Sequence, residues 1–143
     1  MNSYGQRQYK QTQVTTVDKG RLIVLLYEGA IKFLRQAREC QEQGDLPGKT
    51  NAINRALDII GELNQSLNMG EGGEMAVNLR QLYLFWSDHL LRAKIKKDIK
   101  SLDEVIGMLT SLCEAWDRVA SQSEAQEAVP KNEGKSLRAQ ITV

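Results

Sequence analysis

Apolar residues recur at three- and four-residue spacing in four stretches of this chain, a pattern that predicts four amphipathic helices. The first apolar stretch, 22–34, is interrupted only by Glu28 and Lys32. A helix that faces a core usually spends about three positions in seven on apolar residues, and this one spends more. Its two adjacent stripes are Leu22, Leu26, Ala30, Phe33, Ala37 and Cys40, and Ile23, Tyr27, Ile31 and Leu34. One stripe can face the core, so we expect the second to be surplus surface that needs cover from the chain or from a partner.

Short segments of helix-breaking residues separate the four helices. A breaker cluster over Gly44–Gly48, which includes Pro47, is expected to end the first helix, and the glycines within 70–73 predict a tight turn after the second. Asp18 and Asp98 are predicted to cap the first and the fourth helix. The predicted helices span 19–43, 50–67, 74–93 and 99–119. Helices of this length with short connections predict an all-α fold, an antiparallel, elongated four-helix bundle.

The two ends of the chain lack this periodicity. Residues 1–17 are rich in Gln, Ser, Thr and Tyr, which predicts an extended or flexible N-terminal arm rather than a helix. Residues 123–143 are polar and contain Pro130 and Gly134, which predicts a short helix or a disordered tail. The bundle domain is therefore expected to span residues 18–122.

The charge balance narrows the classes of function. Lys and Arg total 19 against 18 Asp and Glu, a formal net charge of +1, so the chain has no general positive field to hold nucleic acid or acidic lipids. No basic segment followed by an apolar one opens the sequence, and no apolar run reaches the roughly 20 residues that a membrane helix needs. We therefore expect a cytoplasmic protein without nucleic-acid binding or stable membrane insertion, in which Cys40 and Cys113 are reduced thiols.

Candidate chemical groups are few. His89 is the single histidine and no Glu-x-x-His motif accompanies it, so we expect no metal site. Both cysteines lie at helical spacing from apolar neighbours, without a positioned base, which disfavours nucleophilic catalysis. The lysines of residues 94–100 have no matching basic face or aromatic platform and are expected to be solvated. The sequence therefore predicts no cofactor, no metal and no enzymatic activity.

Several segments of the chain, taken in order, resemble the flagellar secretion chaperone family (FliS-type), the cytoplasmic chaperones of flagellin. The likeness runs from about Tyr9 to Val119, and its joint order and spacing are more specific than any one motif. The matching segments are Val14-Thr-Thr, Leu22–Leu34, Ile53–Leu63, Gly72–Leu79, Leu82-Tyr, the turn from Ala93 to Asp98, Leu102–Val105 and Leu112–Trp116.

The resemblance implies an export chaperone. Such a bundle holds the C-terminal segment of flagellin in an extended, partly helical wrap, prevents premature polymerisation and delivers the cargo to the export gate of the flagellar type III export apparatus. It also implies an N-terminal arm that lies over part of the cargo site, and Tyr9 and Val14 match that arm here.

The expected partner-binding residues combine this resemblance with the apolar pattern. A cargo segment that is disordered when free would bury its apolar face in grooves between the helices. We expect anchors on the second helix and its neighbours, with polar residues beside them. The candidates are Tyr9, Val14, Tyr27, Ile53, Asn54, Leu57, Ile60, Asn78 and Tyr83.

Two alternatives from other classes stay open on the sequence alone. One is a homo-oligomeric structural four-helix bundle, a homodimer without cargo in which the surplus stripe of the first helix pairs with itself. The other is a four-helix enzyme or metal-storage protein, which would display bound metal or a buried acid–base pair.

Overall fold

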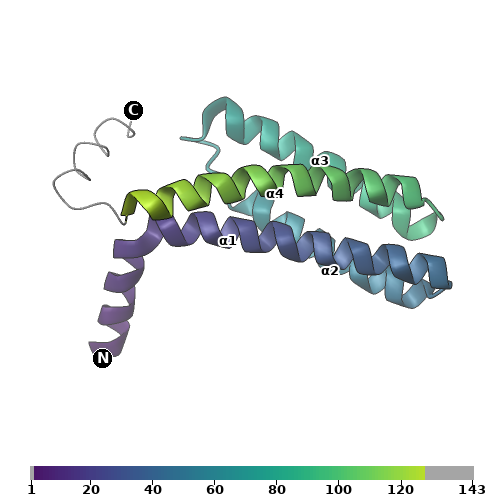
Figure 1. Ribbon diagram of the computed structural model, residues 1–143, viewed down its shortest axis with the longest axis horizontal. Coiled ribbons are helices and arrows are strands. Elements are labelled where there is room, and N and C mark those ends of the chain that lie inside the picture. The colour runs from purple at the N-terminus through teal and green to yellow at the C-terminus, as the bar shows by residue number, and fades with distance from the viewer. Residues whose placement is uncertain (1, 128–143) are drawn as a thin grey trace. The chain divides into compact units, whose positions relative to one another are not determined.

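Four helices and the turns between them make up the part of the chain that the structure describes. The computed structural model describes the backbone of residues 2–127 and the side chains of residues 19–126. The helices are α1 (Asn2–Gln43), α2 (Leu46–Gln65), α3 (Gly73–Ile95) and α4 (Ile99–Glu127) (Figure 1). The expected all-α four-helix class is therefore confirmed. None of the helices over these residues is both long and apolar enough to cross a membrane.

The helices divide between two compact units. One unit, Leu25–Cys113, contains most of α1, all of α2 and α3 and the first half of α4, and we call it the bundle unit. The other contains the first turns of α1 and the last turns of α4. The expectation of one bundle domain over 18–122 stays a prediction.

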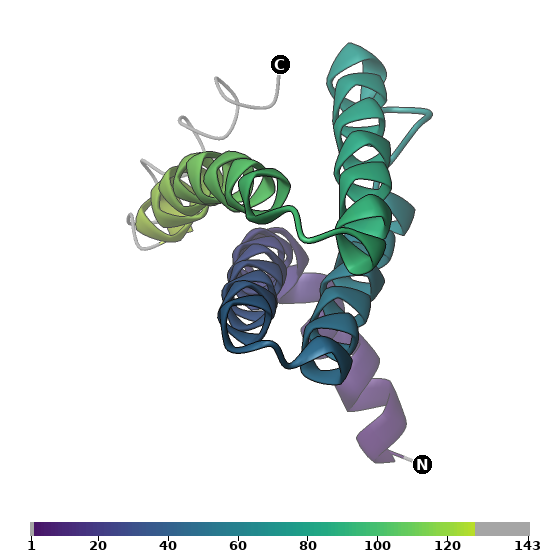
Figure 2. The same ribbon diagram turned by 90° about the vertical axis from the view of Figure 1, so that its right-hand side faces the viewer.

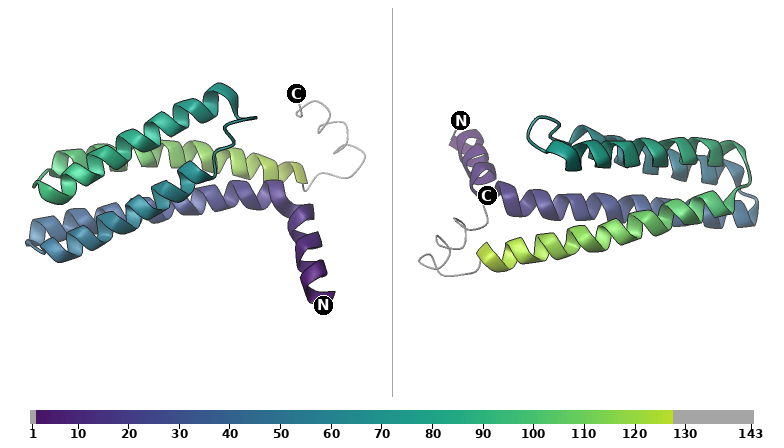
Figure 3. Two further views of the ribbon diagram at one scale, coloured as in Figure 1. Left: turned by 180° about the vertical axis from the view of Figure 1, so that it is seen from behind. Right: turned by 90° about the horizontal axis from the view of Figure 1, so that it is seen from above.

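Within the bundle unit, consecutive helices are antiparallel neighbours. Figure 2 looks towards the end of the bundle unit where the α1–α2 and α3–α4 turns both lie, and Figure 3 shows α2 and α3 together on one side. The Arg38 guanidinium of α1 pairs with Asp103 of α4 at 2.6 Å, which joins the first helix to the last. The connectivity is therefore that of an up-down-up-down bundle.

The core of the bundle unit is filled from all four helices. Trp86 and Leu90 of α3 are fully buried, as the apolar spacing of that helix predicts. The other large hydrophobic side chains buried in the unit are Tyr27, Ile31 and Leu34 of α1, Ile53, Ile60 and Leu63 of α2, Tyr83 of α3, and Leu102, Val105 and Leu109 of α4.

Three aromatic side chains at the centre of this core connect α1 to α3. The Tyr27 and Tyr83 hydroxyls share a hydrogen bond of 2.8 Å, and each ring contacts Trp86, with centroids 6.3 and 5.6 Å away. Burial, and then the hydrogen bond with Tyr27, raise the pKa of the Tyr83 hydroxyl well above its usual value. The Tyr83 hydroxyl therefore stays neutral and serves packing rather than acid–base chemistry.

The surplus stripe predicted for the first helix is largely part of this core. Tyr27, Ile31 and Leu34 are buried, so the prediction that they form free surface is wrong. Within residues 19–43 of α1, the large apolar side chains that stay exposed are Leu22 and Leu25. Because the first helix is apolar on two adjacent stripes, its own sequence does not say which one the neighbouring helices will cover. A stripe that is buried in this way cannot also pair with a second copy of the chain while the bundle is intact.

Only part of the predicted breaker cluster, Gly44–Gly48, lies outside the helices. Gly44 ends α1 with a φ of 78°, and the Asp45 amide donates to the Cys40 carbonyl at 2.8 Å, as in a Schellman motif. Pro47 and Gly48, however, belong to α2, which begins at Leu46. Proline is tolerated in a first helical turn because its missing N–H would have no partner there, and the Asp45 side chain accepts from the Gly48 amide at 3.0 Å.

A buried lysine near the start of α2 contacts the turn between α3 and α4, at the same end of the bundle unit. Lys49 is 1% exposed, and its ammonium donates to the Lys96 carbonyl, which follows α3, at 2.9 Å. Burial, and then repulsion from Lys97, lower the pKa of Lys49 below its usual value. Asp98 caps α4 as predicted, because its carboxylate accepts from the Ser101 amide at 3.0 Å.

In the second unit, Gly20 and Arg21 of α1 lie beside the last turns of α4. Arg21 pairs with Asp117 at 2.7 Å and with Glu124 at 3.0 Å, and Gly20 lies against Ala120. A Cβ at Gly20 would lie 3.7 Å from the Ala120 side chain, so the two helices meet there through small residues.

The N-terminal residues correct one expectation. Residues 2–17 are helical rather than extended, and Asp18 lies inside α1 instead of capping it. The segment lacks proline, and residues such as Gln, Lys and Arg can prolong an existing helix without a new nucleation cost. Its predicted flexibility stays a prediction. At the other end α4 continues to Glu127, and the rest of the predicted tail, 128–143, lies outside the described residues.

Replacement of Lys49 should remove a pH dependence of stability. Because the pKa of Lys49 is lower in the folded protein than its ordinary 10.5, the unfolded chain binds more protons between these two values, and wild-type stability rises with pH there. We expect the free energy of unfolding of the wild type, minus that of Lys49→Met, to increase as the pH approaches 10.5. Urea denaturation at several pH values measures this difference, and a difference that stays constant would contradict the burial of this charge.

The hydroxyl pair offers a second test of the core. Tyr83→Phe leaves the Tyr27 hydroxyl without this partner in a dry environment, which should cost about 1 to 2 kcal/mol of stability. Denaturation of Tyr83→Phe, Tyr27→Phe and the double variant gives a thermodynamic cycle. We expect the double variant to lose less than the sum of the two single losses. Strictly additive losses would show that the two hydroxyls do not interact.

Candidate functional site

The outer face of α3 carries apolar side chains that the described chain leaves exposed. The members of this α3 outer stripe are spaced by seven or four residues and are Val77, Leu84, Leu91 and Ile95. At 100° per residue they fall within a narrow sector of the helix, opposite the buried Trp86. Ile95 is 86% exposed and Leu84 is 58% exposed. Exposed apolar residues that are lined up in this way mark a surface for another protein more often than scattered ones do.

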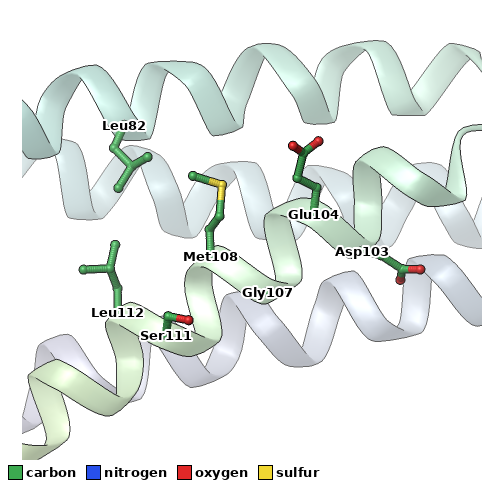
Figure 4. A pocket seen from close by; sticks show the side chains of 7 residues that line it. All are labelled: Leu82, Asp103, Glu104, Gly107, Met108, Ser111 and Leu112. Atoms are coloured by element: carbon green, nitrogen blue, oxygen red, sulfur yellow. The ribbon is translucent and has the colours of Figure 1, made fainter.

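A groove lies between α3 and α4 in the bundle unit. Its volume is 570 Å³, and we call it the α3–α4 groove. It is lined by Leu82 from α3 and by Asp103, Glu104, Gly107, Met108, Ser111 and Leu112 from α4 (Figure 4). Figure 4 shows Leu112 and Leu82 pointing towards each other from the two helices. The middle of the groove is therefore open space between apolar side chains.

One of the residues that line the groove is a glycine. Gly107 lies inside α4, where glycine costs up to about 1 kcal/mol of helix stability relative to alanine. A Cβ at Gly107 would meet no atom within 4 Å, so no packed neighbour in the described structure requires a glycine there. Its effect is to leave bare backbone on the α4 side of the groove, where another chain can approach closely.

The two acidic residues of the groove point in different directions. Figure 4 shows the Glu104 carboxylate on the α3 side of α4 and the Asp103 carboxylate directed away from it. Asp103 is neutralised by Arg38 at 2.6 Å, and Arg38 also pairs with Glu42. Glu104 has the His89 imidazole at 3.7 Å from its carboxylate. The groove thus has an apolar end and an end with a negative charge.

Phe85 connects the groove to the outer stripe. Viewed down the axis of α3, its side chain lies between those of Leu82 and Leu84. Its ring stacks at a tilt on the His89 ring, with the two centroids 4.2 Å apart. Phe85 is 42% exposed. Apolar surface therefore continues from the groove around α3 towards its outer face.

A second, smaller cavity of 360 Å³ lies between α1 and α2. Its lining includes Phe33, whose ring is covered by the Arg55 guanidinium at 5.6 Å, and the thiol of Cys40. Burial, and then the Asp45 charge, raise the pKa of the Cys40 thiol, which disfavours the reactive thiolate. Cys40 and Cys113 are both thiols, as the sequence predicts.

The described side chains form no cluster that could hold a metal ion. No three His, Cys, Asp or Glu side chains among residues 19–126 come together in a way that could hold a metal ion. What the site offers instead is apolar area, one open groove and a few charges, which is the chemistry of binding a polypeptide.

The predicted partner-binding residues separate into accessible and buried groups. Asn54 and Asn78 are exposed and Leu57 is half-buried, so a partner can reach all three. Asn54 accepts a hydrogen bond of 2.8 Å from the Lys94 ammonium. The buried candidates, which no partner can reach while the helices stay packed, are Tyr27, Ile53, Ile60 and Tyr83. The side chains of Tyr9 and Val14 lie outside the described residues.

Sequence reasoning missed the residues that form the exposed surface. The seven-residue spacing of Val77, Leu84 and Leu91 was a signal for a second apolar face on the third helix, because the core stripe of that helix runs through other positions. The role of Gly107 had no such signal. A single glycine inside a helical pattern indicates close approach only once the neighbouring space is known.

Comparisons with known proteins identify relatives of this chain. The model of the family described as flagellar protein FliS matches residues 1–123. The flagellar secretion chaperone FliS of Salmonella typhimurium is 34% identical over 119 residues, which cover 82% of this chain and 88% of that protein. The FliS of Bacillus subtilis is 35% identical over 83% of this chain and 87% of its own length. FliSB of Pseudomonas aeruginosa is 36% identical over 80% of this chain and 94% of its own length.

A solved structure supports the fold. A flagellar chaperone from bacteria superposes with a TM-score of 0.71, covers 85% of this chain and 99% of its own, and is 19% identical in sequence. At that identity the likeness concerns the fold alone.

The relatives are named as flagellar secretion chaperones, a family of proteins that are not enzymes. The match to the family model over most of the chain and the identities above 30% identify the protein's family: this chain belongs to the FliS family of flagellar secretion chaperones.

Proposed function

We propose that this chain binds the disordered C-terminal segment of flagellin in the cytoplasm, prevents its premature polymerisation and delivers it to the flagellar type III export apparatus. Membership of the FliS family supports this function. The observation that carries the proposal is the α3–α4 groove, an open cavity with apolar walls in a chain whose relatives are secretion chaperones. We place the cargo there.

The groove suits a segment that folds as it binds. A cargo helix would set large apolar side chains between Leu82, Met108 and Leu112, and its backbone would approach α4 where Gly107 has no side chain. The segment loses conformational entropy when it orders, so the apolar area that it buries must outweigh that cost. Phe85 and the α3 outer stripe offer further apolar area to a segment that wraps around α3.

The residues proposed from the sequence fit around this site to different degrees. Asn78 precedes Leu82 by four residues on α3 and so lies on the same side of the helix, next to the groove. Asn54 and Leu57 lie on α2 and remain candidates for a longer wrap, as Tyr9 and Val14 do for the arm. The role that we propose for the four buried candidates is to hold the helices whose outer faces bind the cargo.

Two glycines allow a matched test of the groove. Gly107 in α4 and Gly61 in α2 both lie inside helices, and a Cβ at either position would meet no atom within 4 Å. Gly107→Leu fills the groove, whereas Gly61→Leu adds the same side chain on α2. Both changes raise helix propensity, by up to about 1 kcal/mol, so both variants should fold. By calorimetry with a flagellin C-terminal segment, we expect Gly107→Leu to weaken binding about tenfold or more and Gly61→Leu to bind like the wild type.

Each result of this titration bears on the proposal. No heat of binding with wild-type protein at any temperature would refute flagellin binding itself. Weak binding by Gly61→Leu, together with normal binding by Gly107→Leu, would move the cargo to the α2 face. That face carries Asn54 and Leu57, seven and four residues before Gly61.

A further inference from the structure

The two ends of the α3–α4 groove differ in polarity. Glu104, Met108 and Leu112 follow one another at intervals of four residues on the same side of α4, with Leu82 facing Leu112 (Figure 4). A rise of about 1.5 Å per residue separates Glu104 from Leu112 by roughly 12 Å along the helix. An occupant therefore meets apolar side chains at one end and a carboxylate at the other.

Glu104 is the carboxylate that an occupant would meet. Asp103 points away from the α3 side of α4 and is already paired with the Arg38 guanidinium at 2.6 Å. The Glu104 side chain is 56% exposed, and the imidazole of His89 lies 3.7 Å from its carboxylate. This contact is longer than the 2.6 Å contact between Arg38 and Asp103, so the Glu104 carboxylate can still take a closer cation from an occupant.

Filling the groove would change the surroundings of this charge. An apolar segment packed on Met108 displaces water from the neighbouring carboxylate, and a carboxylate that loses water without gaining a partner is costly. A cation on the segment removes that cost and a second carboxylate would increase it. Complementary charge of this kind selects the correct partner and its orientation more than it adds affinity.

We propose that the flagellin segment in this groove carries a lysine or arginine that pairs with Glu104, about seven or eight residues along the cargo helix from the apolar side chain held between Leu82 and Leu112. This proposal rests on the proposed function, since it takes the cargo site to be the α3–α4 groove. Glu104 sets the direction in which the cargo helix lies. A segment of similar apolarity that lacks a cation at this spacing, or has an acidic residue there, is rejected.

A charge-swap experiment tests this pairing. Glu104→Lys places two cations face to face and should weaken binding of the flagellin segment about tenfold, while the milder Glu104→Gln should weaken it about threefold. The matched control is Glu28→Lys, which makes the same change in net charge at an exposed position of α1 that does not line the groove. It should bind within twofold of the wild type. Circular dichroism establishes that each variant is folded.

The cargo is then changed in the complementary way. Each Lys and Arg of the segment is replaced in turn by Glu, and every peptide is titrated into wild type and Glu104→Lys by calorimetry at low and high salt. We expect one reversed peptide to bind the wild type weakly, and to bind Glu104→Lys with an affinity within about threefold of that of the native peptide for the wild type. The difference in affinity between the two proteins should shrink as the salt concentration rises.

The outcomes separate this inference from the proposed function. Wild-type affinity in Glu104→Lys, or the failure of every reversed peptide to restore binding to it, would overturn the pairing. If Gly107→Leu still weakens binding in that case, the groove and the chaperone function stand and only the cation is wrong. If the wild type binds no flagellin segment at all, both proposals fail.

Discussion

The packing of α1 against α3 through Tyr27, Tyr83 and Trp86 decides which apolar surface the bundle has left for a partner. These side chains are almost completely buried and held by a hydroxyl pair and ring contacts. They direct the most apolar stretch of the chain, in α1, to the inside. Among the described residues α3 then carries more exposed large apolar side chains than any other helix, and its outer stripe and its wall of the α3–α4 groove form an apolar surface.

Two features shape the groove on this surface. Gly107 leaves the backbone of α4 bare at a position where a side chain would have met no neighbour, so helix stability is lower there than it could be. Glu104 keeps a carboxylate beside that gap, while the adjacent Asp103 is neutralised by Arg38. A site of this kind binds through area and selects through one charge, which suits a chaperone for a disordered segment.

The sequence predicted the elements of the fold better than it predicted their exposed faces. The helical spacing, the Asp98 cap and the burial of Trp86 could all be predicted from the sequence, because each depends on neighbours along the same helix. Which stripe of α1 is buried, and that Gly107 lines a groove, depend on other helices and cannot be obtained from the local pattern. Pro47 was misinterpreted as a break because proline is also at home in a first helical turn.

The methyl group of Met108 provides the most direct test of the account. Its side chain lies in the middle of the α3–α4 groove, whereas Met69 is in the turn between α2 and α3 and does not line the groove. In a methyl NMR titration with the flagellin C-terminal segment, the account predicts that the Met108 resonance shifts until one equivalent has been added. A segment that binds by calorimetry while the Met108 resonance stays unchanged would contradict the groove as the cargo site.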